Sequence, residues 1–594
     1  MMKTQNHFLT MGTLLNLSAI LITPKSTMKN RKILISTLLL VIFSSGIALA
    51  GLVWTNGALS NPDDVFRSPQ SIAYSTNGTV FVTGKEANAN GQTLIVTRKY
   101  NSSGTLVATA TNSYFVAVGT TTADYPVGIV LDASGNVYVL GRQYFSSTRA
   151  HDMVLIKYNS SLTQQWKKYI YNSGSPTQNY DDKPAKILLD KNNEIYVAGT
   201  WSQPSLLGIE EIVIRKFNSA GTVLFTRSIA QVSSKTIEDA SDMCVDSSLN
   251  LNVVARASDA SNLDYVMYAR ITSTGSLLWK RFCTIPVGYS SIGTPQIECT
   301  VAGVFYLTSS VSREVSQSNH FGKIMLAKYE QSGTQISKQY TPELNFYIDA
   351  TKLRMDAGNN VYLGTDFVAP AGGMNQNHRI YKYNSAGTKV WTYTSPETSF
   401  GLTFETFSSS SLFILFVQSS TIQTKLRKLN ASNGTTIWTE SLTTTIPAGY
   451  INASLSTPHA LAINSSTSDV AYAGRLFGDD GPPSQAFEYR WQVRKYGATN
   501  PRVSDESANV LFSMNAYPVP ANDELTLSFS TENNTSPITI VINDISGKEM
   551  LRQEYSQVSF NDLKISTSNL PAGIYMLTCF YGEQMIFKKF VVDH

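Results

Sequence analysis

Charged side chains are scarce in this chain of 594 residues: only 15% are Asp, Glu, Lys or Arg, and the formal net charge is +4. No run of Lys or Arg is long enough to follow a phosphate backbone, so no nucleic-acid partner is expected. The histidines beyond residue 50 are few and none stands at metal-ligand spacing from another; they are His151, His320, His378, His459 and His594. No G-x-S-x-G, Walker or EF-hand motif occurs. The sequence therefore predicts no catalytic residue, no metal and no cofactor.

Cysteine is equally sparse, with four residues: Cys244, Cys283, Cys299 and Cys579. None forms a C-x-x-C pair, which removes support for a zinc ribbon or a thioredoxin-type site. Cys283 and Cys299 are close in sequence and could pair in an oxidising compartment. The alternative is that both are small buried apolar side chains.

The long apolar run at residues 33–50 carries no charge and follows the basic segment Lys-Asn-Arg-Lys at 29–32. It ends in Ala48-Leu49-Ala50, a small-x-small pattern. This order is typical of a secretory signal peptide cleaved after Ala50, with Met28 a plausible true start. The alternative is an uncleaved membrane anchor, for which the run is near the lower length limit. With cleavage, the mature form has no transmembrane span.

What the chain has in plenty is Ser, Thr, Asn, Gly and Tyr, a mixture that favours strands and tight turns. A strand-turn motif, Lys-Tyr-Asn-Ser-Ser-Gly-Thr at 99–105, returns seven times, the last copy truncated: at 157–163, 216–222, 270–276, 328–334, 382–388, 428–435 and 495–499. A turn followed by an aromatic-rich strand, such as DASGNVYV at 132–139, precedes each copy. Each unit thus predicts four short antiparallel strands, the signature of a propeller blade.

Tryptophan in the fourth strand indicates how the ring closes. Trp166, Trp279 and Trp391 lie two units apart, and the step back from Trp166 to Trp54 is also 112 residues. The eighth unit lacks a fourth strand after Tyr496, so residues 52–57 are expected to supply it and to remove an exposed edge. The prediction is an all-β, eight-bladed propeller over 51–498. Seven blades remain an alternative, because the unit at 402–442 is short.

The repeats resemble secreted bacterial propeller repeats of the SBBP and NHL type in their D-x-x-G-N-x-Y-V turn. Their G-x-x-x-W ending, as at Gly275–Trp279, also resembles quinoprotein-like propellers. These motifs are structural turns, so the resemblance implies a fold and no activity. The recurring turn residues Asp132, Asp190, Asp246 and Asp356 could be calcium ligands, but an Asx turn that caps its own backbone is favoured. For the Trp residues, packing between blades is favoured over a cofactor stack.

A change of pattern follows a polar linker at 499–512. Residues 513–594 alternate strands with Pro, Gly and Asn turns, which predicts a small β-sandwich. This region resembles the type A sorting domain of the type IX secretion system, although Val519 replaces the usual Asn. The matching positions are Tyr517, Pro518, Pro520, Asp544, Gly547, Lys548, Leu570, Gly573, Tyr575, Lys589, Phe590 and Val591. The resemblance implies secretion machinery as a partner, passage across the outer membrane, and release or surface attachment. An ordinary ligand-binding sandwich is the alternative.

Loop lengths point to one working face of the propeller. The loops between second and third strands, and between blades, are long and different, whereas the other turns are short and uniform; the variable loops share one face. The candidate binding residues on this face are Tyr144, His151, Asp152, Tyr180, Asp181, Asp182, Trp201, His378, Asp479 and Asp480. We expect a non-catalytic binding protein for a glycan, peptide or protein. The alternative is a secreted lyase or hydrolase that uses the same face.

Overall fold

The computed structural model divides the chain into two compact units, residues 1–502 and 503–594, which are described separately. Within them the structure describes the ranges that follow: 50–57, 67–87, 92–113, 124–146, 150–171, 181–202, 210–230, 235–316, 319–344, 347–368, 377–407, 410–418, 423–441, 452–464, 466–467, 469–479, 487–501, 512–531, 538–544, 548–555, 563–581 and 584–594. The predicted signal segment lies outside them, apart from Ala50. No helix among these residues is long and apolar enough to cross a membrane.

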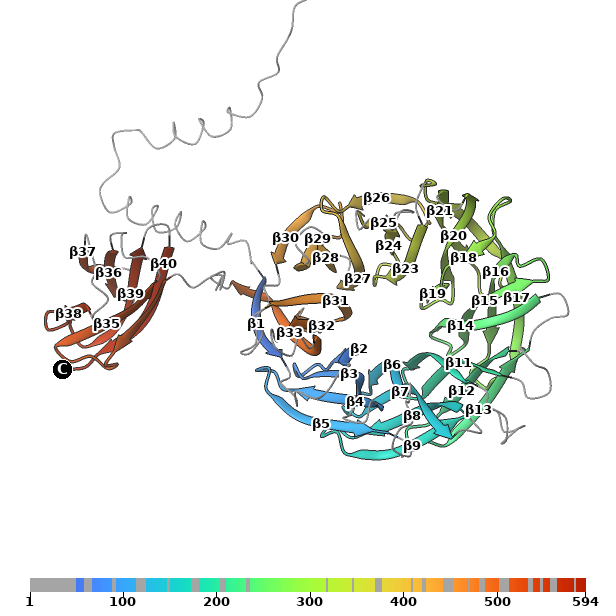
Figure 1. The fold of residues 1–594 in the computed structure, drawn as a ribbon, viewed down its shortest axis with the longest axis horizontal. Coiled ribbons are helices and arrows are strands. Elements are labelled where there is room, and N and C mark those ends of the chain that lie inside the picture. The colour runs from blue at the N-terminus through green and yellow to red at the C-terminus, as the bar shows by residue number, and fades with distance from the viewer. Residues whose placement is uncertain are drawn as a thin grey trace, which may run out of the picture. The chain divides into compact units, whose positions relative to one another are not determined.

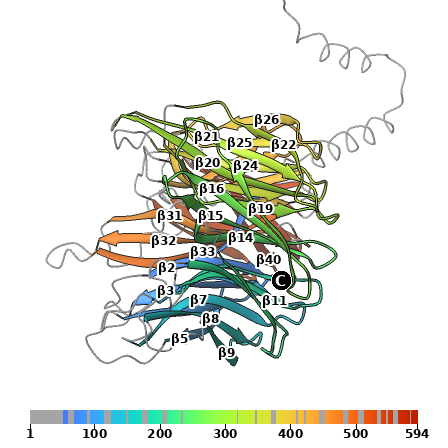
Figure 2. The same cartoon turned by 90° about the vertical axis from the view of Figure 1, so that its right-hand side faces the viewer.

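The first unit is a ring of eight antiparallel sheets in the described residues (Figure 1), each running from the centre outwards. Figure 2 shows the ring from its side, with strands of successive blades one above another. Blades one to four consist of β2 (Arg67–Tyr74), β3 (Val80–Ala87), β4 (Thr93–Tyr100), β5 (Leu106–Asn112); β6 (Tyr125–Leu131), β7 (Val137–Ser146), β8 (Ala150–Tyr158), β9 (Gln164–Ile170); β10 (Lys183–Leu189), β11 (Ile195–Ser202), β12 (Glu210–Phe217), β13 (Val223–Ile229); and β14 (Lys235–Val245), β15 (Leu251–Asp259), β16 (Asp264–Ile271), β17 (Leu277–Thr284).

Blades five to seven follow the same order. They consist of β18 (Ser291–Ile292), β19 (Gln296–Cys299), β20 (Phe305–Ser316), β21 (Asn319–Tyr329), β22 (Gln335–Tyr340); β23 (Tyr347–Met355), β24 (Val361–Val368), β25 (Arg379–Tyr383), β26 (Lys389–Thr394); and β27 (Ser399–Phe407), β28 (Ser411–Gln418), β29 (Gln423–Asn430), β30 (Thr436–Ser441). The short unit at 402–442 is therefore a complete blade, and the alternative of seven blades is wrong.

The eighth blade combines both ends of the propeller. It contains β31 (Asn452–Ile463), β32 (Val470–Asp479) and β33 (Phe487–Pro501), and its outer strand is β1 (Ala50–Gly57). Trp54 pairs with Lys495, just as Trp166 pairs with Lys157 and Trp391 with Lys382. The shared register confirms the predicted closure by an N-terminal strand.

The repeated side chains stabilise the turns within a blade and the contacts between blades. Asp356 is a typical turn residue: its Oδ1 accepts the backbone N–H groups of Gly358 and Asn360, both at 2.9 Å, and its Oδ2 accepts the Tyr362 hydroxyl at 3.0 Å. The Asx interpretation of these turns is thereby confirmed. The Trp391 indole donates to the Ala431 carbonyl of the following blade at 3.1 Å, which confirms a packing role for that side chain.

The disulfide bond joins a different pair of cysteines from the pair that the sequence suggested. Cys244 of β14 pairs with Cys299 of β19, whereas Cys283 is a buried free thiol, so the suggested Cys283–Cys299 bond is wrong. The two bonded residues are 55 positions apart, about one unit, and their Cα atoms are 5.7 Å apart. Equivalent strands of adjacent blades approach each other at the centre of the ring, a proximity that sequence distance conceals.

The second unit is built from two sheets. One contains β34 (Phe512–Tyr517), β35 (Glu524–Thr531) and β38 (Leu563–Ser566); the other contains β36 (Ile538–Asp544), β37 (Glu549–Tyr555), β39 (Gly573–Tyr581) and β40 (Gln584–Val592). They enclose a separate apolar core that includes Leu570, Tyr575 and Phe590. This arrangement confirms the predicted sandwich.

Candidate functional site

Part of the predicted binding face comes together on the second and third blades. Tyr144 of β7 and His151 of β8 are direct neighbours across the hairpin, with ring centroids 5.4 Å apart and an edge-on geometry. The buried Asp182 donates its backbone N–H to the His151 carbonyl at 2.9 Å. Asp181, which precedes β10, is half-exposed beside them. Three stretches of chain thus meet at one edge of the ring.

His151 lies at the centre of a charged group. Its Nδ1 is 2.8 Å from Asp181 Oδ1 and 2.9 Å from Arg142 Nη2, and Arg142 also pairs with Asp181 at 2.5 Å. Burial lowers the pKa of His151 and outweighs the opposing hydrogen bond to Asp181. Burial alone would raise the pKa of Asp181, but the His151 hydrogen bond and the Arg142 charge bring it below its usual value. Asp181 is therefore a carboxylate at neutral pH, available on its exposed side.

Other predicted residues lie elsewhere. Trp201 is 7% exposed and belongs to an apolar core, with its indole N–H 3.4 Å from Glu211 Oε2. Asp152 is also buried. Asp479 is the last residue of β32 and pairs with Phe487 of β33, so it belongs to the hairpin strand and not to a loop. Tyr180 and Asp480 lie outside the described residues.

His378 does not lie on an exposed face, contrary to prediction. It is 0% exposed, its Nδ1 is 2.5 Å from Ser399 Oγ, and its ring is 4.5 Å from that of Phe416. Burial lowers the pKa of His378 to about 3, with the Arg427 charge adding to the effect. The residue is a neutral part of the core between the sixth and seventh blades.

The innermost strands carry a set of side chains that the sequence analysis missed. In each blade this strand buries one apolar residue in a different core cluster; these residues are Ile72, Ile129, Ile187, Met243, Ile297, Leu353, Phe404 and Leu461. Because side chains alternate along a strand, the residues before and after each one point away from that core. The apolar ones pack in or against the core of another blade interface; they are Ala73, Val130, Leu188, Cys244, Ala460 and Ala462.

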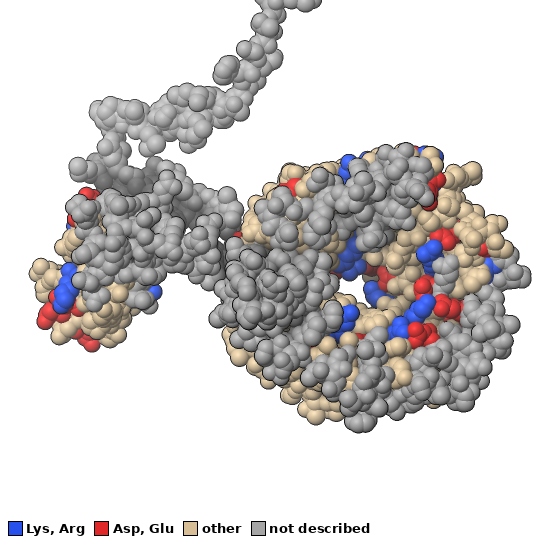
Figure 3. Space-filling model, in the orientation of Figure 1, with Lys and Arg blue, Asp and Glu red and all other residues tan. Residues whose placement is uncertain are grey.

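The flanking positions are uneven in chemistry. The residues before the core residue are Ser71, Gly128, Lys186, Asp242, Gln296, Lys352, Thr403 and Ala460; those after it are Ala73, Val130, Leu188, Cys244, Glu298, Arg354, Glu405 and Ala462. Charged members occur only in blades three to seven, whereas blades eight, one and two contribute small or apolar residues and Ser71. Figure 3 shows charged side chains gathered at the central opening. We call Lys186, Asp242, Gln296, Glu298, Lys352, Arg354 and Glu405 the polar arc.

At one end of the polar arc, Lys186 and Asp242 join adjacent blades. Lys186 Nζ is 2.9 Å from Asp242 Oδ1. The Asp242 carboxylate also accepts the backbone N–H of Met243 at 3.0 Å and that of Ile297 at 3.3 Å. Gln296 continues the chain of contacts, because its Oε1 accepts the Leu353 N–H at 2.7 Å. This end of the arc holds its carboxylate firmly.

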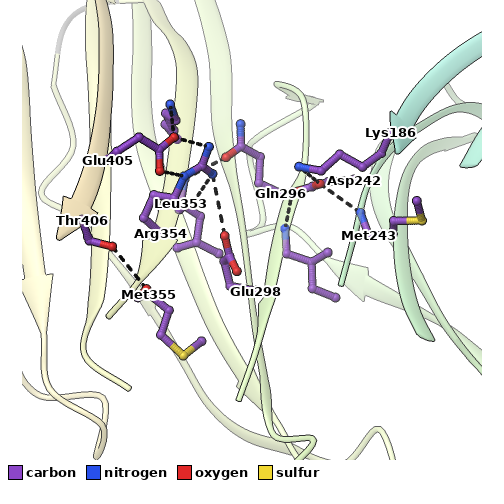
Figure 4. Close-up of polar contacts among 12 residues, drawn as sticks. Lys186, Asp242, Met243, Gln296, Glu298, Leu353, Arg354, Met355, Glu405 and Thr406 are labelled. Atoms are coloured by element: carbon purple, nitrogen blue, oxygen red, sulfur yellow. Dashed lines mark hydrogen bonds and ion pairs between the residues drawn. The ribbon is translucent and has the colours of Figure 1, made fainter. Parts of the chain in front are cut away.

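At the other end, Arg354 lies between two carboxylates (Figure 4). It forms a bidentate pair with Glu405, with Nε and Nη2 each 2.8 Å from a carboxylate oxygen. Lys352 Nζ reaches the same carboxylate at 3.1 Å and Thr403 Oγ1 at 2.7 Å. Glu298 is 3.7 Å from Arg354 Nη1, too far for a hydrogen bond. Glu298 is therefore the loosely held acid of the arc.

The surroundings of Glu298, Lys352 and Glu405 shift the pKa values of these groups in different ways. Burial raises the pKa of Glu298 to about 7, and the Asp242 and Glu405 charges add to this while Arg354 and Lys186 oppose it. Burial also lowers the pKa of Lys352 to about 8. Burial alone would raise the pKa of Glu405, but Arg354 and Lys352 lower it to about 2. The channel thus holds a carboxyl group and an amine that both titrate near neutral pH.

The described residues contain no group of three His, Cys, Asp or Glu side chains that could hold a metal ion. What the polar arc offers is a set of charged donors and one loosely held acid. A signal for it existed in the sequence: Gln296-Ile297-Glu298 and Lys352-Leu353-Arg354 alternate polar and apolar residues. That alternation is ordinary for any half-buried strand, so it did not identify a site.

The fold and the C-terminal unit together define an exported β-propeller protein. Residues 515–593 match the family model for a secretion system C-terminal sorting domain. Leu570, Tyr575 and Phe590 of the expected motif lie in its core, Asp544 accepts the Lys548 N–H at 3.0 Å, and Gly547 lies outside the described residues. The C-terminal unit is a type IX sorting domain, and the protein is secreted or attached to the cell surface.

Solved structures with related folds are similar at low identity. A protein of unknown function from Bacteroides caccae is 11% identical, with 48% of this chain and 89% of that chain covered and a TM-score of 0.27. A protein of unknown function from Dyadobacter fermentans is 11% identical, with 55% of this chain and 97% of that chain covered and a TM-score of 0.32. The polysaccharide lyase Uly1 is 8% identical, with 75% of this chain and 92% of that chain covered and a TM-score of 0.38. A search of curated proteins finds no match. Function must therefore be argued from this chain's own residues.

Proposed function

We propose that this protein binds a glycan, peptide or protein ligand at the central channel, entered from the variable-loop face. The observation that carries the proposal is the polar arc itself, in which charged side chains from neighbouring inner strands contact one another. The side chains of Lys186, Lys352 and Arg354 are 39%, 20% and 24% exposed, so the arc is open to solvent while held in place. A rigid ring that presents partly exposed charged groups suits recognition of a polar or charged ligand.

The group around His151 offers a second candidate contact surface. Asp181 exposes 47% of its side chain, yet Arg142 and His151 fix its position. Lys183, two residues further on, is 40% exposed and pairs with Asp239 at 2.9 Å and Glu210 at 3.0 Å. Pre-positioned side chains lose little conformational entropy on binding, which favours affinity.

The test is a screen of the full-length mature protein against glycan and peptide arrays, followed by titration of each hit. D181N is expected to weaken a hit that contacts this face by roughly tenfold, the usual effect of losing one charged hydrogen bond. Ser219, in the short turn between β12 and β13 of the third blade, offers the control S219A, which should leave binding unchanged. Equal loss in both variants, or no hit on either array, would contradict the proposal.

A second candidate function rests on Glu298. A carboxyl group that titrates near pH 7 beside an amine that titrates near pH 8 can serve as acid and base in a lyase or hydrolase. Under this alternative E298Q would abolish turnover of a bound glycan or peptide while leaving its affinity measurable. Under the binding proposal no hit from the arrays is converted by the wild-type protein.

A further inference from the structure

We infer that the polar arc binds the carboxylate of a small acidic ligand, and that Glu298 takes up a proton as it does so. This inference rests on the proposed function, since it identifies the chemistry of a ligand in the same channel. It depends on three features of the arc: unused donors, one loosely held acid, and a charge balance that changes with that acid.

The basic residues retain donors that the described contacts do not use. Lys186 Nζ has three N–H groups and a described contact only to Asp242. Lys352 Nζ contacts Glu405 and Thr403, which leaves a third N–H. The described hydrogen bonds of Arg354 engage three of its five N–H groups, two with Glu405 and one with the Leu353 carbonyl at 2.8 Å. The arc can therefore donate to an added anion without breaking its own pairs.

The acids differ in how strongly they are held. Asp242 accepts two backbone N–H groups besides Lys186, and Glu405 accepts the Arg354 fork and Lys352. Glu298 has only the 3.7 Å approach to Arg354 among the described contacts. An anion that enters the channel would compete with Glu298 for Arg354, and not with the other two carboxylates.

Charge balance then favours a single negative charge. Lys186, Lys352 and Arg354 carry three positive charges, and Asp242, Glu298 and Glu405 carry three negative charges when all are ionised. Because Glu298 titrates near pH 7, its protonated form leaves the arc with a net charge of +1. A monoanionic carboxylate neutralises that charge, whereas a phosphate dianion exceeds it. The charged groups facing Glu298 come from β10, β14, β23 and β27, namely Lys186, Asp242, Lys352, Arg354 and Glu405.

Two classes of small molecule carry a carboxylate of this kind. A sugar acid or an acidic amino acid has a carboxylate at one end and carbon-bound hydrogens along its body. Both share the chemistry that the arc would recognise, and the experiment separates them.

The experiment is isothermal titration calorimetry of the full-length mature protein with glucuronate, glutamate, glucose and inorganic phosphate. At pH 7 Glu298 is about half protonated while Lys352 is still mostly charged. In buffers of different ionisation enthalpy we therefore expect a carboxylate probe to bind with uptake of about half a proton, and its dissociation constant to rise with pH from 6 to 8. Glucuronate without glutamate would identify a sugar acid as the ligand class, and the reverse an acidic amino acid.

Three variants make the result specific. E298Q keeps the size of the side chain and should abolish proton uptake, leaving affinity independent of pH between 6 and 7. K186M should weaken binding roughly tenfold by removing one charged donor, and K389M, at an exposed position of β26, should change nothing. Melting temperatures confirm that each variant is folded. Proton uptake that persists in E298Q overturns the inference, and so does binding of carboxylates no tighter than that of glucose.

Failure of the inference is distinct from failure of the proposed function. If an array ligand without a carboxylate binds and D181N weakens it, the binding function stands and the carboxylate site is wrong. If neither the arrays nor the carboxylate probes give binding, both are wrong.

Discussion

Lys157 and Trp166 show what the repeated side chains do. Both donate to the carbonyl of Ser219 in the next blade, at 2.7 and 3.2 Å. Lys382 and Trp391 make the same pair of contacts to Ala431. Repeated side chains thus make the same contacts at different blade interfaces. The residues with the potential to bind a ligand, in contrast, occur once each, as in the polar arc and around His151.

A buried histidine shows how one residue can set the pH dependence of stability. The pKa of His378 is about 3 in the folded protein, against 6.5 for an exposed histidine, so only the unfolded chain gains a proton between these values. Stability is then lost as the pH falls from about 6.5 towards 3, and is unaffected above 6.5. We expect this group to lower the free energy of unfolding by about 2 kcal/mol between pH 7 and pH 5, as measured by urea denaturation.

The matched variant for this prediction is H378Q, which cannot titrate. It should lose that part of the pH dependence, although its stability at pH 7 is also expected to fall because the core packing changes. The same slope in H378Q and wild type would show that His378 is protonated without unfolding.

At the level of the strand, the innermost strand of each blade has two roles. Its apolar side chains fill the cores on both of its faces, and in blades three to seven some of its positions carry the polar arc. A tight approach accompanies this arrangement at Gly128 of β6, where an added Cβ would lie 2.7 Å from Ile187 of the next blade. The larger channel residues of blades three to seven instead reach the neighbouring inner strand through polar contacts.

The disulfide between β14 and β19 links two such inner strands. Closing a loop of this length stabilises a protein by about 2–4 kcal/mol, mainly by restricting the unfolded chain. We expect reduction to lower the melting temperature of wild type and to raise the number of titratable thiols in denaturant from two to four. The C244A/C299A double variant should be insensitive to reductant.

Cys283 provides the control for that measurement. It is buried near the sulfur of Met325, at 3.7 Å, and is not bonded to another cysteine. C283A should keep the response to reductant, because the bonded pair is intact. Loss of the response in C283A would mean that Cys283 is the true partner.

For the whole molecule, the propeller and the sorting domain have separable tasks. The family match at 515–593 indicates export, whereas the candidate ligand site lies entirely in the first unit. A chain that ends at Arg502 should keep the melting transition of the propeller but stay in the periplasm of a host with type IX secretion. Cell fractionation with the full-length chain as control measures this. Secretion of the truncated chain would contradict it.

The other end of the chain allows a related measurement. We expect N-terminal sequencing of the secreted protein to begin near Gly51, after the apolar run at 33–50. A mature protein that retains this run would contradict cleavage and favour the anchor. Because β1 begins at Ala50, cleavage there leaves nearly the whole closing strand in place.

The sequence alone determined the repeated blade, its closure by the N-terminal strand and the sorting domain, and it favoured eight blades over seven. Each depends on local turn chemistry or on a period along the chain: the Asn and Gly turns recur in every unit, and the spacing of Trp54 from Trp166 places the N-terminal strand in register. Such patterns can be recognised in the sequence without knowing which distant segments are in contact.

Only the tertiary structure decided which side chains meet. The inner strands contain register shifts, between Pro184 and Lys186 and between Ala240 and Asp242, and each shift changes which residues face the channel. Sequence spacing could not show that Cys299 bonds to Cys244, or that His378 is fully buried. The polar arc joins residues from Lys186 to Glu405 because closing the ring brings five inner strands together, and that closeness is a property of the ring and not of any one unit.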